Sequence, residues 1–202
     1  MRCASLLGLL LLIYATGNEA RGVKRWSKER LTWKFGDPYQ LLSNRQQLVI
    51  RKFVANAFDE WSSALDGILE LEEHKENLKE PPDINVYFAK RNHSCIENFD
   101  GRGGIVAHSA YPSVGLLHLD GDELWHTGDS RKGDVDLRYV LIHEIGHVLG
   151  LHHSKFKKSV MRKNYRSSKT QKRSYQLSKY DIRSIQKLYK FKSKHLRKYL
   201  LA

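Results

Sequence analysis

The spacing of histidines between residues 143 and 153 constrains this chain more than any other feature of its sequence. His143 and His147 are four residues apart, so on a helix both side chains project from one face and can share a metal ion. Gly150 can adopt the left-handed conformation that ends a helix, and the reversed chain can then bring His153 to the same ion. Three protein ligands leave one coordination position for water, which is typical of a catalytic zinc site.

Glu144 lies beside the first ligand but is rotated away from the ligand direction, which suits a carboxylate that contacts metal-bound water. We therefore predict peptide hydrolysis with Glu144 as the general base. Met161 follows His153 by eight residues and is expected to pack beneath the ligands without binding the metal. The alternative, ordinary helix histidines, is disfavoured because Gly150, His153 and Met161 complete the longer metzincin pattern.

A second group of metal-ligating residue types lies between residues 93 and 123. Three histidines and one cysteine can form a closed four-ligand zinc site: His93, Cys95, His108 and His118. Asp100, Asp120 and Glu123 offer the hard oxygen ligands that suit Ca²⁺, and the glycine-rich loop at 98–105 can add backbone carbonyls. The alternative is a set of exposed polar loop residues, with Cys95 a free buried cysteine.

The N-terminus predicts secretion. A charged start, an apolar run from Leu6 to Ala15 and a small-residue site at Ala15–Gly17 indicate a signal peptide over residues 1–17. A membrane anchor is the weaker alternative, since about 20 apolar residues are needed to span a bilayer. Residues 18–25 are a basic segment that is either a processing site or a solvated linker. The sequon at Asn92 is compatible with secretion.

The formal net charge of +13 is concentrated at the C-terminus. Residues 155–202 hold 17 of the 35 Lys/Arg residues and one of the 22 acidic residues, Asp181. We expect residues 155–198 to bind sulfated glycosaminoglycans or an anionic surface, with a solvated charged face as the alternative. The signal peptide argues against nucleic acid as the partner, and we expect a monomer.

Hydrophobic periodicity predicts a single α+β domain. Strands are expected at 31–35, 69–71, 84–88, 105–110 and 116–119. Helices are expected at 44–65, at the segment carrying His143 with Asp134 or Asp136 as its cap, and from Ser178 to about Tyr189 with Asp181 completing a capping box. Residues 191–202 are expected to form a basic tail.

From Trp26 to Tyr189 the sequence resembles the catalytic domain of the matrix metalloproteinases, the matrixin branch of the metzincins. The resemblance rests on the histidine motif, the Leu31-Thr32-Trp33 strand, the Phe58-x-x-Trp61-Ser62 helix end and the closing Asp181-Ile182 to Leu188-Tyr189 helix. It implies a metzincin fold, with a mostly parallel five-stranded sheet and three helices, over residues 26–190. It also implies a metalloendopeptidase acting on extracellular, matrix-type proteins.

The resemblance also assigns roles to residues. It implies structural zinc on His93, Cys95, His108 and His118. It implies calcium on the side chains of Asp100, Asp120 and Glu123 and the carbonyls of Gly101, Gly103 and Ile105. The strand Ile105-Val106-Ala107 is then the edge to which an extended substrate adds, and the expected substrate-binding residues are Val106, Ala107, Tyr139 and Tyr165.

Four departures from the family pattern qualify these expectations. Cys95 replaces an aspartate, although a thiolate is also a good zinc ligand. The short loop from Tyr111 to Leu117 lacks the aspartate of a second calcium site, which we expect to be missing. No proline follows Met161, so the wall of the specificity pocket is not defined. Finally, we expect a minimal form without a prodomain, cysteine switch or haemopexin-like domain, secreted active or representing a truncated isoform.

Two rival functions remain open at this point. One is a non-catalytic zinc-binding or matrix-binding module, against which the intact Glu144 argues. The other is an astacin-like or adamalysin-like protease, and the second metal cluster at 93–123 argues against both rivals.

Overall fold

The structure is a computed structural model that describes residues 9–14, 24–93, 95, 97–126, 135–165 and 176–200. The expected leader cleavage site at 15–17 and the candidate cap Asp134 lie outside these ranges. The elements, in chain order, are β1 (Leu9–Tyr14), β2 (Arg30–Gly36), α1 (Asn44–Leu65), β3 (Glu70–Glu73), β4 (Ile84–Ala89), β5 (Ile105–Ala110), β6 (Leu116–Asp120), β7 (Trp125–His126), β8 (Val135–Asp136), α2 (Leu137–Val148), β9 (Asn164–Tyr165) and α3 (Lys179–Leu200).

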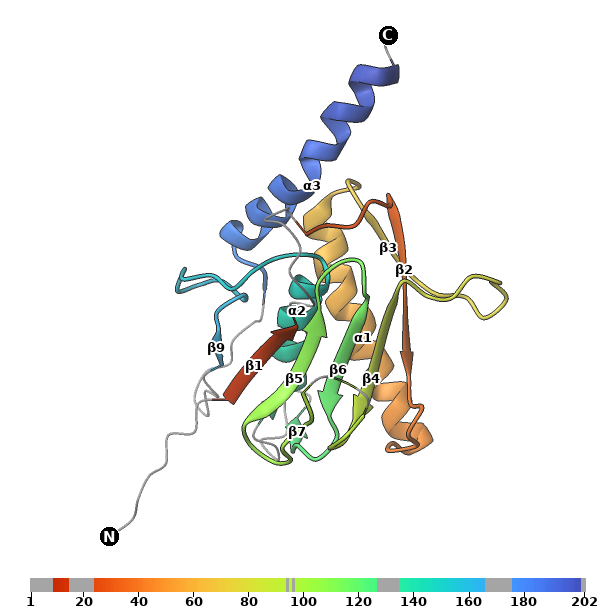
Figure 1. Ribbon diagram of the computed structural model, residues 1–202, viewed down its shortest axis with the longest axis vertical. Helices are drawn as coiled ribbons and strands as arrows, with labels where there is room; N and C mark the ends of the chain where they lie inside the picture. The colour runs from red at the N-terminus through yellow and green to blue at the C-terminus, as the bar shows by residue number, and fades with distance from the viewer. Residues whose placement is uncertain are drawn as a thin grey trace.

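Five strands form a mixed sheet in the order β3-β2-β4-β6-β5. Neighbouring strands are parallel from β3 to β6, and β5 runs antiparallel to β6 with His108 opposite His118. The predicted α+β class and mostly parallel five-stranded sheet are confirmed. Two short strands that were not predicted, β1 and β9, continue this sheet beyond β5 (Figure 1).

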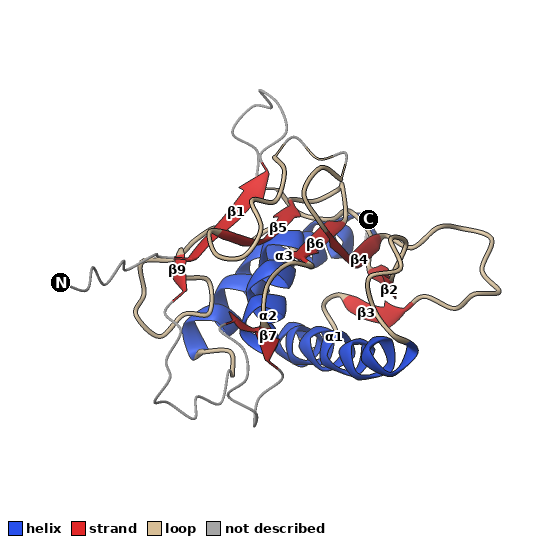
Figure 2. Cartoon of the chain, turned by 90° about the horizontal axis from the view of Figure 1, so that it is seen from below, coloured by secondary structure: helices blue, strands red, loops and turns tan. Residues whose placement is uncertain are grey.

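The three helices lie on one side of the sheet (Figure 2). Two tryptophans of the core connect the layers. Trp33 of β2 stacks on Phe58 of α1 with ring centroids 4.8 Å apart, and the indole N–H of Trp61 donates to the carbonyl of Ile142 in α2 at 2.9 Å. Because Trp61 is fully buried and also bonded, it fixes α1 against the helix that carries the histidine motif.

Helix α1 has the bounds that the sequence predicts. Ser43 caps it, and Ser43 and Gln46 form a reciprocal capping box that satisfies backbone N–H groups of the first turn. Its buried residues recur at helical spacing, and they pack against both the sheet and α2, as Phe58 and Trp61 do. The helix ends at Asp66, which takes the left-handed conformation with φ at 50°.

Helix α2 is buried on all sides from Val140 to Val148, which explains why its apolar residues do not form a single stripe. Asp136 is its N-cap and accepts from the backbone N–H of Arg138. Gly150 ends the helix with φ at +104°, and a Cβ there would lie 2.2 Å from the carbonyl oxygen of Lys24. Glycine is therefore required both by the backbone conformation and by the close approach of the N-terminal segment.

The prediction that the last helix ends near Tyr189 is wrong. Helix α3 continues to Leu200 and extends away from the rest of the molecule (Figure 1). No glycine or proline interrupts residues 179–200, and Lys, Arg and Leu are good helix formers. The predicted capping box is present, since Ser178 and Asp181 exchange hydrogen bonds between side chains and backbone N–H groups.

Strand β1 comes from the apolar run that the sequence assigns to a signal peptide. It pairs in parallel with β5, Leu11 opposite Ala107 and Tyr14 opposite Ala110, and antiparallel with β9. In the full chain it therefore lies along the edge of β5 predicted to receive substrate. Within the described residues, no helix combines the length and apolar character needed to cross a bilayer.

Candidate active site and metal centres

The structure brings His143, His147 and His153 together at the end of α2. Their nearest nitrogens lie within 4.8 Å of one another, and Nε2 of His143 is 3.0 Å from Nε2 of His147. Nε2 of His153 is buried and has no hydrogen-bond partner. Three converging imidazole nitrogens, one of them unsatisfied, fit a shared metal ion.

Backbone carbonyls orient the two helical ligands. Nδ1 of His143 lies 2.7 Å from the carbonyl oxygen of Val160, and Nδ1 of His147 lies 2.6 Å from that of Leu151. A carbonyl can only accept, so both rings carry their proton on Nδ1 and present Nε2 as the free ligand atom. The turn after Gly150 thus serves two purposes: it brings His153 back and supplies the Leu151 carbonyl.

The histidines are held in the neutral form that binds a metal. Burial lowers the pKa of His143 to about 3 and holds the pKa of His147 well below its usual range. Burial also lowers the pKa of His153, with a further contribution from Lys163. Neutral imidazoles do not have to lose a proton before they bind a metal ion, so metal binding near neutral pH is not opposed by protonation of these ligands.

Glu144 is fully buried next to this triad. Its Oε2 accepts a hydrogen bond from the Ser109 hydroxyl at 2.5 Å, while its Oε1 has no hydrogen-bond partner in the part of the chain that the structure describes. Burial raises the pKa of Glu144 to about 8, and the bond from Ser109 acts in the opposite direction. A buried carboxylate with one free oxygen is suited to exchanging a proton with a reactant.

Met161 packs against the ligand helix. It is buried, and a Cβ placed on Gly146 would lie 2.4 Å from its sulfur and 2.9 Å from the ring of Trp61. Met161 therefore contacts α2 one residue before His147. The turn that carries it is tied to α3, because Asp181 accepts from the Ser159 hydroxyl at 2.5 Å and from the Val160 N–H at 3.2 Å.

Asp181 thus links α3 to the metal ligands. The same Val160 whose N–H bonds Asp181 offers its carbonyl to His143, and the Tyr139 hydroxyl donates to that carbonyl at 3.1 Å. Tyr139 therefore supports the turn under the ligands, and its expected contact with substrate stays a prediction. Tyr165 lies in β9, and Val106 and Ala107 lie in β5, beside the strand β1.

The second cluster converges from three segments. Nε2 of His108 lies 3.1 Å from Nε2 of His93 and 3.0 Å from Nδ1 of His118, and the Cys95 sulfur lies 3.2 Å from that same Nδ1. Burial lowers the pKa of both His108 and His118 to about 3 and raises that of the half-buried Cys95 thiol. Three imidazoles and one sulfur with ligand atoms within 4.8 Å of one another are the donor set of a closed zinc site.

The three predicted calcium carboxylates interact through their charges, but they are not among the groups of described residues whose ligand atoms lie within 4.8 Å of one another. Asp120 and Glu123 are buried; burial raises the pKa of each, and the charge of Asp100 raises both further. Oδ2 of Asp120 has no partner, whereas Glu123 accepts from the N–H of Gly103 at 2.7 Å. Gly101, Gly103 and Gly104 all have positive φ, which curls this loop around Asp100 towards Ile105. Carboxylate oxygens are the ligand type that Ca²⁺ prefers, so calcium at these residues stays a prediction.

Asp83, which precedes β4, contacts β2 and the segment before it. Its carboxylate accepts from the backbone N–H of Thr32 at 2.9 Å and pairs with Lys28.

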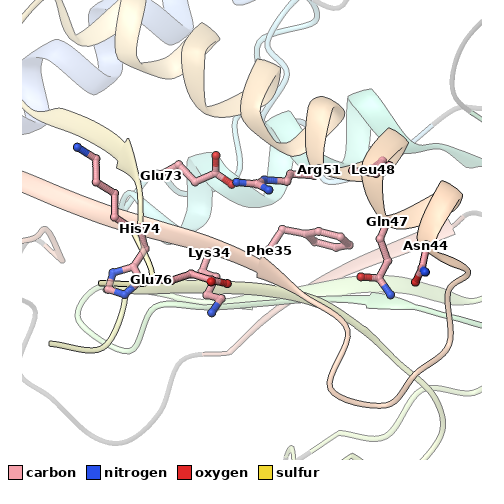
Figure 3. A pocket seen from close by; sticks show the side chains of 10 residues that line it. Lys34, Phe35, Asn44, Gln47, Leu48, Arg51, Glu73, His74 and Glu76 are labelled. Atoms are coloured by element: carbon pink, nitrogen blue, oxygen red, sulfur yellow. The ribbon is translucent and has the colours of Figure 1, made fainter. Parts of the chain in front are cut away.

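A groove of about 770 Å³ lies between the first turns of α1 and strands β2 and β3 (Figure 3). An ion pair between Arg51 and Glu73, 2.6 Å apart, crosses it, and Phe35 and Leu48 add apolar surface. The groove shares no lining residue with either histidine cluster, and among the described residues no group able to hold a metal lies in it. The volume of a groove therefore does not by itself identify the catalytic site of this molecule.

A histidine triad beside a buried carboxylate, on a mixed sheet backed by helices, defines the class of zinc-dependent peptidase domains. Residues 25–190 match the Matrixin peptidase family (Peptidase_M10). The chain is 34% identical to Matrix metalloproteinase-C of Caenorhabditis elegans over 82% of its length, and 34% identical to human Matrix metalloproteinase-16 over 81%. It is 37% identical to Metalloendoproteinase 1 of Glycine max over 67% of its length. The chain therefore belongs to the matrixin family.

The matched part corresponds to 28% of the C. elegans relative, 26% of the human relative and 44% of the soybean relative. The chain thus spans less than half the length of these curated relatives.

One contact at the site could not be read from the sequence motif. Ser109 lies 35 residues before Glu144 and belongs to another element, so no local spacing links the two. The sequence feature that could have indicated this contact is the alternation of side chains along the strand at 105–110. Because side chains alternate along a strand, His108 and Ser109 face opposite sides of the sheet, and Ser109 faces the helices.

Proposed function

We propose that this chain is a secreted zinc-dependent metalloendopeptidase that hydrolyses internal peptide bonds of extracellular proteins. The observation that carries the proposal is the convergence of three neutral histidine nitrogens beside a buried carboxylate whose Oε1 is free. Membership of the matrixin family supports the same chemistry. The names of the relatives support matrix proteins as the substrate class.

In this proposal, His143, His147 and His153 hold the catalytic zinc, and the chain's own residues supply the rest of the mechanism. When bound there, zinc acidifies a water molecule and polarises the scissile carbonyl. Glu144 accepts the proton of the attacking water and later delivers it to the leaving amine, so one carboxylate serves as base and then as acid. Met161 and the Val160 carbonyl keep the ligand rings in place during both steps.

The remaining metal sites have a structural role in this proposal. We assign zinc to His93, Cys95, His108 and His118, and calcium to Asp100, Asp120 and Glu123 with carbonyls of the adjoining loop. Both sites fix the segments that lead into and out of β5 and β6. They therefore stabilise the strand to which an extended substrate would add.

We further propose that residues 1–17 are a signal peptide and are removed on secretion. Removal would take away β1 and free the edge of β5 at Ile105–Ala107 for a substrate strand. The test of the proposed function is cleavage of a peptide library, with the cleaved bonds identified by mass spectrometry. Cuts at internal bonds are expected, and a zinc-loaded protein that cuts none of the peptides would overturn the proposal.

The basic C-terminal region supports a polyanion as a second partner. Along the described part of α3, Lys179, Arg183, Lys187 and Lys190 are all exposed and recur every three or four residues, so they form one stripe of positive charge. Lys155, Lys157 and Lys158 are also exposed. We assign residues 155–198 to binding of sulfated glycosaminoglycans.

Neutralising the stripe should weaken heparin binding. The variant Arg183→Gln/Lys187→Gln/Lys190→Gln should elute from heparin at a clearly lower salt concentration than the wild type, since each lost charge removes a screened contact with sulfate. The matched control Lys52→Gln/Lys75→Gln/Lys79→Gln removes the same charge from exposed positions of the body and should elute close to the wild type. Equal shifts in both variants, or wild-type elution near about 0.15 M salt, would contradict a defined site.

A further inference from the structure

The partner of Glu144 is a single hydroxyl on the neighbouring strand. The Ser109 side chain donates to Oε2 of Glu144 at 2.5 Å, and both residues are fully buried. Oε1 of the same carboxylate is buried without a partner. The two oxygens of the carboxylate are therefore distinguished by the fold: one is bonded to the protein, and one is left for a reactant.

Strand β5 holds the hydroxyl in place from both sides. Ser109 pairs with Leu117 of β6, next to the pair His108 and His118 that belongs to the second metal cluster. On the other side of Ser109, Ala110 ends the strand, and the hydroxyl of Tyr111 lies 2.6 Å from Nδ1 of His152. Because its neighbours are fixed to the second metal cluster and to the loop of His153, Ser109 has little freedom to move away from Glu144.

A glutamate side chain has several rotatable bonds, whereas a proton transfer needs the accepting oxygen at one position. A displacement of about 1 Å in such a group can lower a rate by about 100-fold. A hydrogen bond to the non-reacting oxygen fixes the carboxylate plane without occupying the oxygen that reacts. This is the arrangement that the Ser109 hydroxyl provides.

We propose that Ser109 is a positioning residue for the general base: its hydroxyl holds Oε2 of Glu144 and thereby directs Oε1 to the attacking water. This inference rests on the proposed function, since it assigns a partner to the base of that reaction. Ser109 itself neither touches the substrate nor binds the metal.

The test compares Ser109→Ala and Ser109→Thr in the full zinc-loaded chain, with kcat and KM measured on one cleaved peptide. Ser109→Ala should lower kcat by about 10- to 100-fold with KM and zinc content unchanged, because the base is present but no longer fixed. Ser109→Thr keeps the hydroxyl on a residue that strands tolerate well, and it should restore most of kcat.

A second comparison separates positioning from a general structural effect. In a Glu144→Ala background, the further change Ser109→Ala should have no additional effect on the residual rate, because its target is gone. An unchanged kcat in Ser109→Ala, or an equal further loss in the Glu144→Ala background, would overturn the role of Ser109. Absence of peptidase activity in the wild type would instead overturn the proposed function itself.

Discussion

Replacing Glu144 with alanine should lower kcat/KM by about 100- to 10,000-fold, the range expected when a general base is removed. The carboxylate is fully buried, and its Oε1 has no hydrogen-bond partner among the described residues that could take over its role. The loss should fall on kcat, because Glu144 exchanges a proton with the reacting groups and does not hold the substrate.

Measurement of the zinc content distinguishes loss of the general base from loss of the metal-binding geometry. The histidine rings are oriented by the carbonyls of Val160 and Leu151 and not by Glu144, so the variant should keep the zinc content of the wild type. Activity and metal should therefore be measured on the same preparation. Full residual proteolysis in a zinc-loaded Glu144→Ala protein would exclude Glu144 as the base.

Replacing His153 with alanine should remove the third ligand and with it both zinc retention and activity. We expect zinc affinity at this site to fall by more than the roughly 10- to 100-fold typical of lost outer partners, because a direct ligand is removed. The Nε2 atom of His153 is buried without a hydrogen bond, so the side chain has no other evident role there. Zinc bound per chain after dialysis is the measurement.

The adjacent residue provides a matched control. His152 carries the same side chain but is exposed, and its Nδ1 lies 2.6 Å from the Tyr111 hydroxyl instead of facing the triad. His152→Ala should therefore keep both zinc and most of the activity. Equal zinc loss in the two variants would show that the loop as a whole, and not the ligand atom of His153, determines metal binding.

The sequence predicted best what is encoded locally. The bounds of α1 follow from the capping box at Ser43 and Gln46 and from apolar residues at helical spacing, and both are visible in a short window. The histidine triad was also predicted, because the four-residue spacing and Gly150 determine its geometry within eleven residues.

Contacts between distant elements could not be derived in the same way. The bond from Ser109 to Glu144 and the bonds from Asp181 to the turn of Met161 depend on how β5, α2 and α3 pack together. The continuation of α3 to Leu200 was missed, although residues 190–200 contain no glycine or proline and are rich in good helix formers. The pairing of β1 with β5 likewise depends on an exposed sheet edge that the sequence does not display.

The central claim is that the triad and Glu144 form a zinc peptidase site. The most direct measurement is peptide cleavage by the wild-type chain before chelation, after removal of zinc with a chelator, and after zinc is added back, with Glu144→Ala in parallel. The account predicts that cleavage stops on chelation and returns with zinc in the wild type, and that zinc restores no comparable cleavage in Glu144→Ala. Cleavage that persists in the zinc-free protein, or that zinc restores equally in both proteins, would contradict it.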